Sequence, residues 1–148
     1  MDEQEDWEER GRKARAGVAP LQFMLGTWTG TGVNHGAPVT GKLVVRPILD
    51  GTWLEAREIQ FGASGVQEHE DVSLYRYDPE EHRLEVVHLM GHAHMSRHPV
   101  EPVGDAFHWI TGPLSPRLEI HPTEAGLRFD VCFPFEGAPG ATMDYTAT

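Results

Sequence analysis

From Thr27 to the C-terminus, apolar and polar side chains alternate with a period of two, and residues that favour turns separate the alternating segments. This pattern is typical of β-strands that place one face on a core. It predicts ten strands, at residues 27–33, 40–47, 52–61, 67–77, 83–90, 92–98, 104–111, 116–121, 126–134 and 140–147. Asp50-Gly51 and Asp78-Pro79 are strong turn signals, so we expect an antiparallel meander. Because an open meander has adhesive edges, we predict an all-β, closed barrel of about ten strands.

The same alternation predicts which side chains face the interior of the barrel. Apolar and aromatic side chains share one parity in the fifth predicted strand and in the last two. The predicted inward rows are Leu84, Val86, His88 and Met90; Leu127, Phe129, Val131, Phe133 and Phe135; and Met143 and Tyr145.

The third predicted strand is less regular than the others. Its apolar residues Trp53, Ile59 and Phe61 share one face with Glu55 and Arg57. Two charges on an apolar face mean either that this face carries the polar part of a pocket, or that the opposite face of the strand is the one that points inward.

The N-terminal segment differs in character from the rest of the chain. Residues 1–16 carry mixed charges at high density, which predicts a solvated helix or arm outside the barrel wall. The apolar segment 21–25 follows Pro20 and precedes Gly26, as expected of a short helical turn that plugs one end of the barrel. We therefore expect a charged N-terminal arm, residues 1–19, and a lipocalin-like barrel domain, residues 20–148.

Composition and charge narrow the functional classes. The length of 148 residues suits one domain with its own core. With 12 Lys and Arg against 23 Asp and Glu, the net charge of −11 opposes binding to nucleic acid or to an anionic membrane. The one cysteine, Cys132, and the lack of a long apolar segment favour a cytoplasmic protein with an inert thiol. A homodimer is left open.

The densest chemical signal is the segment HLMGHAHMSRH, residues 88–98. A His-x-His pair on one strand presents two imidazoles on the same side, about 6.5 to 7 Å apart, which suits joint ligation of one metal ion. With His88 from the neighbouring strand, His92 and His94 could hold zinc, copper or iron. The alternatives are that these histidines bind a ligand without metal, or that Gly91 forms a turn and the histidines face water.

A second polar group lies on the third and fourth predicted strands. Antiparallel pairing could set Glu55 or Arg57 opposite His69 or Asp71, near Tyr75, and a carboxylate beside an imidazole can act as a general base. Glu55, His69 and Asp71 are therefore candidate catalytic residues. The alternative is a ladder of ion pairs on the outer wall.

Several segments resemble known barrel families. Residues 26–32 (GTWTGTG) follow an apolar helical turn and resemble the Gly-x-Trp opening of the calycin superfamily and, in extended form, the start of nitrobindin-type heme-binding β-barrels. Residues 48–55 (ILDGTWLE), 73–78 (SLYRYD) and 143–146 (MDYT) resemble a related, uncharacterised bacterial lipocalin-like family. The resemblance implies a barrel with a small-molecule pocket. It also implies heme as an alternative ligand, held by a histidine near the C-terminal strands, although the last histidine here is His121, on the outward parity.

We therefore predict that the barrel cavity binds a small hydrophobic or aromatic molecule. An enzyme that uses the same cavity is the alternative, either a metal-dependent oxidoreductase or an isomerase or cyclase with Glu/His acid–base chemistry. The predicted ligand-binding residues are Trp28, Trp53, Arg57, Phe61, His69, Tyr75, Val86, His88, Met90, Phe107, Trp109, Phe129, Phe133 and Tyr145.

Overall fold

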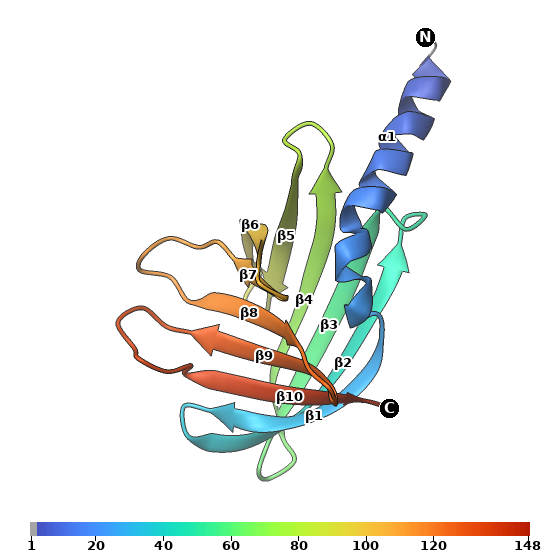
Figure 1. Ribbon diagram of the computed structural model, residues 1–148. Helices are drawn as coiled ribbons and strands as arrows, with labels where there is room; N and C mark the ends of the chain where they lie inside the picture. Colours follow the sequence, from blue (N-terminus) through green and yellow to red (C-terminus); the bar gives the residue numbers. More distant parts are fainter. Residues whose placement is uncertain (1–2) are drawn as a thin grey trace.

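The chain forms a closed antiparallel barrel in which each strand pairs with the next along the sequence, and the first pairs with the last (Figure 1). The computed structural model describes residues 3–148. The architecture confirms the predicted ten-stranded meander and is compatible with a calycin-like fold. The strands are β1 (Gly26–Asn34), β2 (Ala37–Ile48), β3 (Trp53–Gly62), β4 (Gln67–Asp78), β5 (Arg83–Met90), β6 (His94–Val103), β7 (Ala106–Trp109), β8 (Arg117–Pro122), β9 (Gly126–Cys132) and β10 (Ala141–Ala147).

A helical segment precedes the barrel and seals one end of it. The helix α1 (Glu3–Val18) continues into the 3₁₀ helix η1 (Ala19–Met24), in which Leu21 and Met24 are fully buried. The Trp28 indole at the start of β1 donates a hydrogen bond to the Met24 carbonyl at 2.9 Å. The prediction that the apolar segment plugs the barrel is therefore confirmed.

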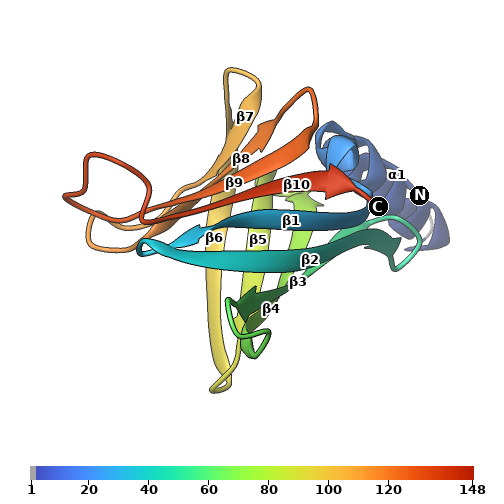
Figure 2. The ribbon, with the colours of Figure 1, turned by 90° about the horizontal axis from the view of Figure 1, so that it is seen from below.

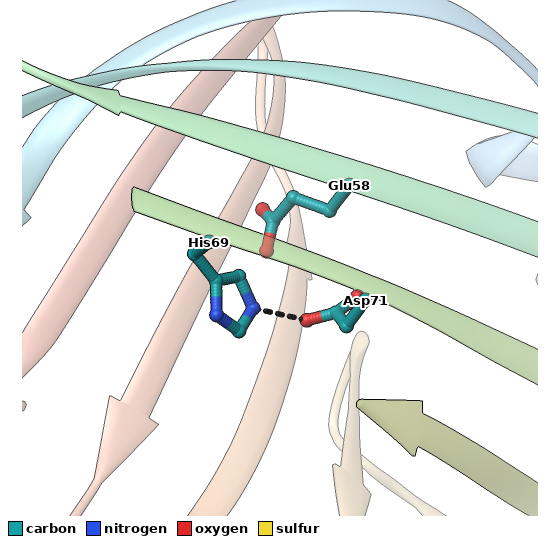
Figure 3. A group of neighbouring side chains, drawn as sticks. All are labelled: Glu58, His69 and Asp71. Carbon is teal, nitrogen blue, oxygen red and sulfur yellow. Dashed lines mark hydrogen bonds and ion pairs between the residues drawn. The ribbon is translucent and has the colours of Figure 1, made fainter. Parts of the chain in front are cut away.

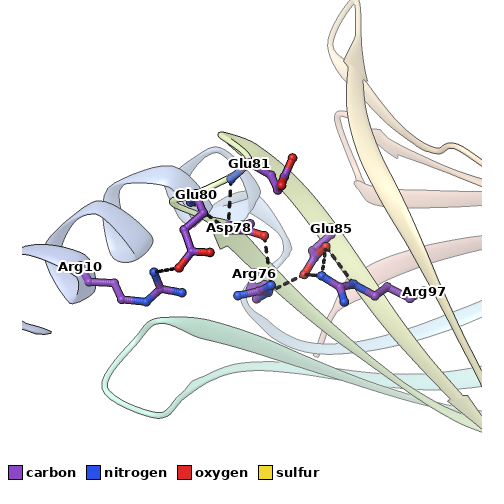
Figure 4. Close-up of polar contacts among 7 residues, drawn as sticks. All are labelled: Arg10, Arg76, Asp78, Glu80, Glu81, Glu85 and Arg97. Atoms are coloured by element: carbon purple, nitrogen blue, oxygen red, sulfur yellow. Dashed lines mark hydrogen bonds and ion pairs between the residues drawn. The ribbon is translucent and has the colours of Figure 1, made fainter.

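The helix α1 lies outside the sheet but touches it closely. A Cβ atom at Gly17 would lie only 2.0 Å from the Tyr77 ring, so glycine is what allows the helix to approach β4. Arg10 pairs with Glu80 in the β4–β5 turn at 2.6 Å (Figure 4). These contacts attach the charged arm to the barrel.

The β4–β5 hairpin beside the helix is held by buried charge on the outer wall (Figure 4). Glu85 is 1% exposed and accepts hydrogen bonds from Arg76 and Arg97. Asp78 accepts hydrogen bonds from the backbone N–H groups of the turn and also pairs with Arg76 at 3.3 Å. The charges satisfy one another, so the hairpin keeps its position relative to α1.

The two ends of the barrel are different. Figure 2 shows α1 and the C-terminus at one end, and the β1–β2 and β9–β10 connections at the other. Because η1 fills the first end, any internal space must lie toward the second, which we call the open end. Within residues 3–148, no helix combines the length and apolar character needed to cross a membrane.

The inward rows predicted for three strands are confirmed in their regular parts. Val86, Leu127, Phe129, Met143 and Tyr145 are all buried. Phe133 and Phe135 are exceptions because β9 ends at Cys132, and Phe135 lies in the following loop with 93% of its surface exposed.

The register predicted for the third strand is wrong at its aromatic positions. In β3 the inward side chains include Leu54, Ala56 and Glu58, which are buried, while Trp53 and Phe61 lie on the outer face. Long cationic side chains cover these two rings: the Arg76 guanidinium lies 5.4 Å from the Trp53 ring, and Lys42 Nζ lies 6.0 Å from the Phe61 ring. The aromatic surface is thereby shielded without entering the core.

Candidate functional site

The barrel contains a cavity of about 390 Å³ toward its open end. Its apolar lining includes Leu43, Ala56, Trp109, Phe129 and Met143. A volume of this size is typical of sites for small organic molecules. The polar lining is concentrated on β3, β4, β5 and β6.

Cross-strand pairing brings the polar side chains together. Glu58 on β3 lies directly opposite Asp71 on β4, and Gln60 lies opposite His69. His88 on β5 faces the same cavity from the next strand, so that its Nε2 lies 3.4 Å from Asp71 Oδ2. Figure 3 shows Glu58, His69 and Asp71 converging from the two neighbouring strands.

Glu58 is a carboxyl group held in an apolar setting. It is 9% exposed, accepts a hydrogen bond from the Tyr145 hydroxyl at Oε2, and accepts another from Gln60 at Oε1 at 3.3 Å. Burial, reinforced by the negative charge of Asp71, raises the pKa of Glu58 to about 7. Glu58 can therefore either hold or release a proton near neutral pH.

Asp71 has the opposite tendency although it lies beside Glu58. Burial raises its pKa, but hydrogen bonds from His69 and His88 outweigh that effect, and the pKa of Asp71 is lowered overall. His69 Nε2 donates to Asp71 Oδ2 at 2.6 Å, and this bond raises the pKa of His69 above its usual range. The pair is thus an ionised carboxylate that favours a protonated imidazole.

Aromatic rings form the wall beside this polar group. The His88 ring meets the Trp109 ring edge-on at 4.9 Å between centroids, and His98 stacks on Trp109 at 5.9 Å. The Trp109 indole donates a hydrogen bond to the buried Tyr75 hydroxyl at 3.2 Å. Burial lowers the pKa of His98, so His98 favours the neutral imidazole.

Glu58, His69 and Asp71 each offer a ligand atom within 4.8 Å of the other two, which is close enough for a shared metal ion. However, the 2.6 Å separation of His69 and Asp71 is that of a charge-assisted hydrogen bond. Ligand atoms around a tetrahedral zinc ion lie about 3.3 to 3.6 Å apart, given metal–ligand distances of about 2.0 to 2.2 Å. The geometry therefore fits proton chemistry better than a metal centre.

The predicted ligand-binding residues divide into three groups. The cavity lining includes His69, Tyr75, His88, Met90, Trp109 and Phe129. The buried residues outside that lining are Trp28, Val86, Phe107 and Tyr145. Contrary to the prediction, Trp53, Arg57 and Phe61 lie on the outer wall, and Phe133 lies in the loop after β9 beside the His35 ring.

The candidate catalytic residues are also divided by the barrel wall. His69 and Asp71 meet in the cavity, as predicted from their spacing, whereas Glu55 lies on the outer face and pairs with Arg46 at 3.0 Å. The interpretation of Glu55 as part of the pocket is therefore wrong, because the face of β3 that points inward is the one opposite to the predicted face.

The three histidines predicted to bind a metal are not brought together. The strand expected at 92–98 begins instead at His94, and His92 and Ala93 adopt positive φ angles of 68° and 57° in a tight turn. His92 is exposed in this turn, whereas His88 and His94 line the cavity. In the part of the chain that the structure describes, the ligand atoms of these three residues do not form a group within 4.8 Å.

Sequence reasoning missed Glu58, which is the most strongly perturbed carboxyl group in the cavity. A signal was available, because Glu55 and Arg57 mark the odd face of β3 as the solvated one. On that assignment Leu54 and Ala56 face inward, and Glu58 is the acidic residue that follows them on the same face. Gln60, which also lines the cavity, was missed for the same reason. His98 was missed because its strand has few apolar residues to mark the inward face.

His121, the last histidine of the chain, does not reach this cavity. It lies on the outer wall, where its Nε2 is 3.3 Å from Glu119 and 3.5 Å from Asp130. The sequence as a whole matches no protein-family model and no curated protein.

Proposed function

We propose that the protein binds a small molecule in the barrel cavity, with an apolar or aromatic body and a hydrogen-bonding end group. The observation that carries this proposal is the division of one cavity between an apolar wall and a convergent polar wall. Trp109 and Phe129 would contact the body of the ligand, while Glu58, His69 and His88 would contact its polar end.

The polar wall favours particular end groups. Asp71 is ionised, but its negative charge is already shared between two imidazoles. Glu58 remains as the acceptor whose charge depends on pH, and Gln60 lies beside it. A hydroxyl or amine on the ligand would satisfy these acceptors, whereas a second carboxylate would be repelled. The calycin-like barrel and the resemblance of segment 26–32 agree with a ligand carrier.

Binding can be tested with the neutral fluorescent probe N-phenyl-1-naphthylamine. Its emission rises in apolar surroundings, and we expect a saturable rise with the wild-type protein. Ser96→Trp places an indole into the cavity and should weaken the affinity for the probe at least tenfold. Met95→Trp is the matched control, because Met95 neighbours Ser96 on the same strand but is 65% exposed on the other face.

Equal binding to both variants, or no saturable signal from the wild-type protein, would contradict the proposal. Native mass spectrometry of the freshly purified, untagged protein then identifies what remains bound. A mass increment would give the class of the ligand directly, and it would also show whether a metal ion or heme is bound.

A second candidate function is acid–base catalysis on the bound molecule. The observation that favours it is the opposite shift of two neighbouring carboxyl groups, since the pKa of Glu58 is raised and that of Asp71 is lowered. Such a pair is typical of sites where one group transfers a proton and the other holds a charge. An isomerase acting beside a carbonyl group is the simplest reaction of this class.

This candidate can be tested with phenylacetone in D₂O, by following exchange of its α-protons by NMR. Wild-type protein should accelerate exchange, and Glu58→Gln should abolish the acceleration while the probe still binds. An exchange rate that is the same for the wild-type protein and for Glu58→Gln would leave binding as the function.

A further inference from the structure

A second group of histidines and carboxylates lies on the outer wall, away from the cavity. In the sheet, His108 on β7 is paired with Glu119 on β8, and Glu119 is paired with Asp130 on β9. His121 is two residues beyond Glu119 and therefore shares its face. The four side chains form a compact patch that the cavity chemistry does not use.

We propose that Glu119, His121 and Asp130 form a binding site for a zinc ion, with His108 beside them. Glu119, His121 and Asp130 each have a ligand atom within 4.8 Å of the other two. His108 Nε2 lies 3.7 Å from Glu119 Oε1 at the edge of this group but is not one of its three members, so a water molecule would complete four-coordinate zinc. Imidazole nitrogen and carboxylate oxygen are ligands that zinc accepts together.

The distances suit a metal better than they suit hydrogen bonds. His121 Nε2 lies 3.3 Å from Glu119 Oε1 and 3.5 Å from Asp130 Oδ2. An imidazolium paired with a carboxylate would approach to about 2.7 to 2.9 Å. Atoms at two corners of a tetrahedral zinc site lie about 3.3 to 3.6 Å apart, and both distances from His121 fall in this range.

His121 also lacks a hydrogen bond at its inner nitrogen. Among the described residues, its Nε2 is the buried side-chain nitrogen or oxygen that has no hydrogen-bond partner. A buried polar atom without a partner is costly and asks for a physical explanation. A metal ion between the imidazole and the two carboxylates supplies one.

The outer oxygen of each carboxylate is already held, and this orients the inner oxygen toward His121. Arg117 donates two hydrogen bonds to Glu119 Oε2, and Thr142 donates to Asp130 Oδ1 at 2.9 Å. Partners of this kind behind the ligands are typical of metal sites, where they fix the geometry.

The local charge also permits a cation to bind. A third carboxylate, Asp144, lies 3.8 Å from Arg128, which also pairs with Asp130 at 3.4 Å. Three carboxylates face two guanidinium groups, Arg117 and Arg128, so the patch keeps a net negative charge when its histidines are neutral. Side-chain exposure of 31% at His121 leaves a path for the ion.

The test is titration of metal-depleted, untagged protein with Co²⁺, whose visible absorption is strong in tetrahedral sites. We expect one equivalent to bind with tetrahedral intensity and to be displaced by Zn²⁺. His121→Gln should weaken binding at least a hundredfold. Asp130→Asn retains an oxygen that can accept the Thr142 hydrogen bond and should weaken binding by tenfold or more.

Matched controls separate this site from other histidines. His69→Gln changes the cavity and His92→Gln changes the exposed turn, and both should bind Co²⁺ as the wild-type protein does. Circular dichroism of each variant checks the fold, and Asp130→Asn provides the test if His121→Gln does not fold. Absence of a tetrahedral spectrum in the wild-type protein, or unchanged binding in both outer-wall variants, would overturn the proposal.

Discussion

The cavity cluster of Glu58, His69 and Asp71 and the outer-wall cluster of Glu119, His121 and Asp130 contain the same residue types on neighbouring strands. In the cavity the imidazole and a carboxylate are joined by a 2.6 Å hydrogen bond. On the outer wall the closest approach of imidazole and carboxylate is 3.3 Å. In the cavity, the imidazole proton is therefore already engaged in a hydrogen bond. On the outer wall, the imidazole and the carboxylates are far enough apart for a metal ion to lie between them.

The difference arises from what surrounds each pair of carboxylates. No arginine contacts Glu58 in the described chain, and burial raises its pKa. On the outer wall, burial also raises the pKa of Glu119, but hydrogen bonds from Arg117 and Cys132 and the nearby charges of Arg117 and His108 together outweigh it, and the pKa is lowered overall. The same local pattern thus favours proton exchange inside the barrel and a permanent negative charge outside it.

The largest expected effect is on stability at high pH, through Glu58→Gln. The folded pKa of Glu58, about 7, lies above its ordinary value of 4.5, so the folded state holds a proton that the unfolded state has lost between these two pH values. Stability is therefore full below 4.5 and falls as pH rises through about 7. Glutamine removes this loss, and the variant should be more stable than wild type at pH about 8.5 by up to about 3 kcal/mol.

Urea unfolding of wild type and Glu58→Gln at both ends of this range measures the effect. The two proteins should differ little near pH about 4.5, where both side chains are neutral. A Glu58→Gln variant that is less stable at high pH would show that contacts stabilise the buried carboxylate by more free energy than its burial costs.

The next effect compares Asp71→Asn with Asp130→Asn. Asp71 accepts a short hydrogen bond from His69 and pairs with His88 at 3.4 Å in the cavity, so its replacement should cost about 2 kcal/mol of unfolding free energy. Asp130 is no more exposed than Asp71, but it accepts one neutral hydrogen bond from Thr142 and pairs loosely with Arg128 at 3.4 Å, so its replacement should cost less, about 1 kcal/mol. Chemical denaturation at pH about 7 compares them; equal losses would show that the two walls hold their carboxylates alike.

A smaller effect of opposite sign is expected from Glu119→Gln. Because the folded pKa of Glu119 lies below its ordinary value, the ionised group adds stability above that value, and this is lost as pH falls through the folded pKa. Glutamine should therefore destabilise the protein at neutral pH, by less than about 1 kcal/mol because the site is partly exposed. Thermal melts at neutral and acidic pH would test this sign against that of Glu58→Gln.

The smallest expected effect is spectroscopic. The pKa of His69 should lie above 6.5 in the wild-type protein and that of His98 below it, as their surroundings imply. Asp71→Asn should lower the pKa of His69, because the hydrogen bond that His69 donates to the Asp71 carboxylate is the main cause of its rise. NMR titration of the imidazole protons measures both, and an unchanged His69 would show that burial and Glu58 decide its pKa.

Alternation predicted the barrel well but did not predict which side chains of β3 enter it. Period-two patterns identify a face only when apolar residues stay on one side. In β3 the large rings of Trp53 and Phe61 lie outside under Arg76 and Lys42, while Glu58 lies inside. Hydrophobicity alone therefore points to the wrong face, and the catalytic candidate Glu55 was chosen for that reason.

The histidine-rich segment was misjudged for a different reason. His92 and His94 look like neighbours on one strand, but the positive φ angles at His92 and Ala93 turn the chain between them. This turn joins β5 to β6, where Met90 pairs with His94. Gly91 had indicated it as the alternative, but the His-x-His spacing favoured a continuous strand.

By itself, the sequence determined the ten strands, the closed meander, the apolar plug and the inward rows of β5, β9 and β10, because each depends on local periodicity and turn chemistry. Only the tertiary structure decided the register between strands, and with it which carboxylate meets which imidazole. Glu58 meets Asp71, and Glu119 meets Asp130, because the register of each pair of neighbouring strands is selected by packing of the whole barrel. The chemistry of both clusters follows from that choice and from the side of the wall on which each lies.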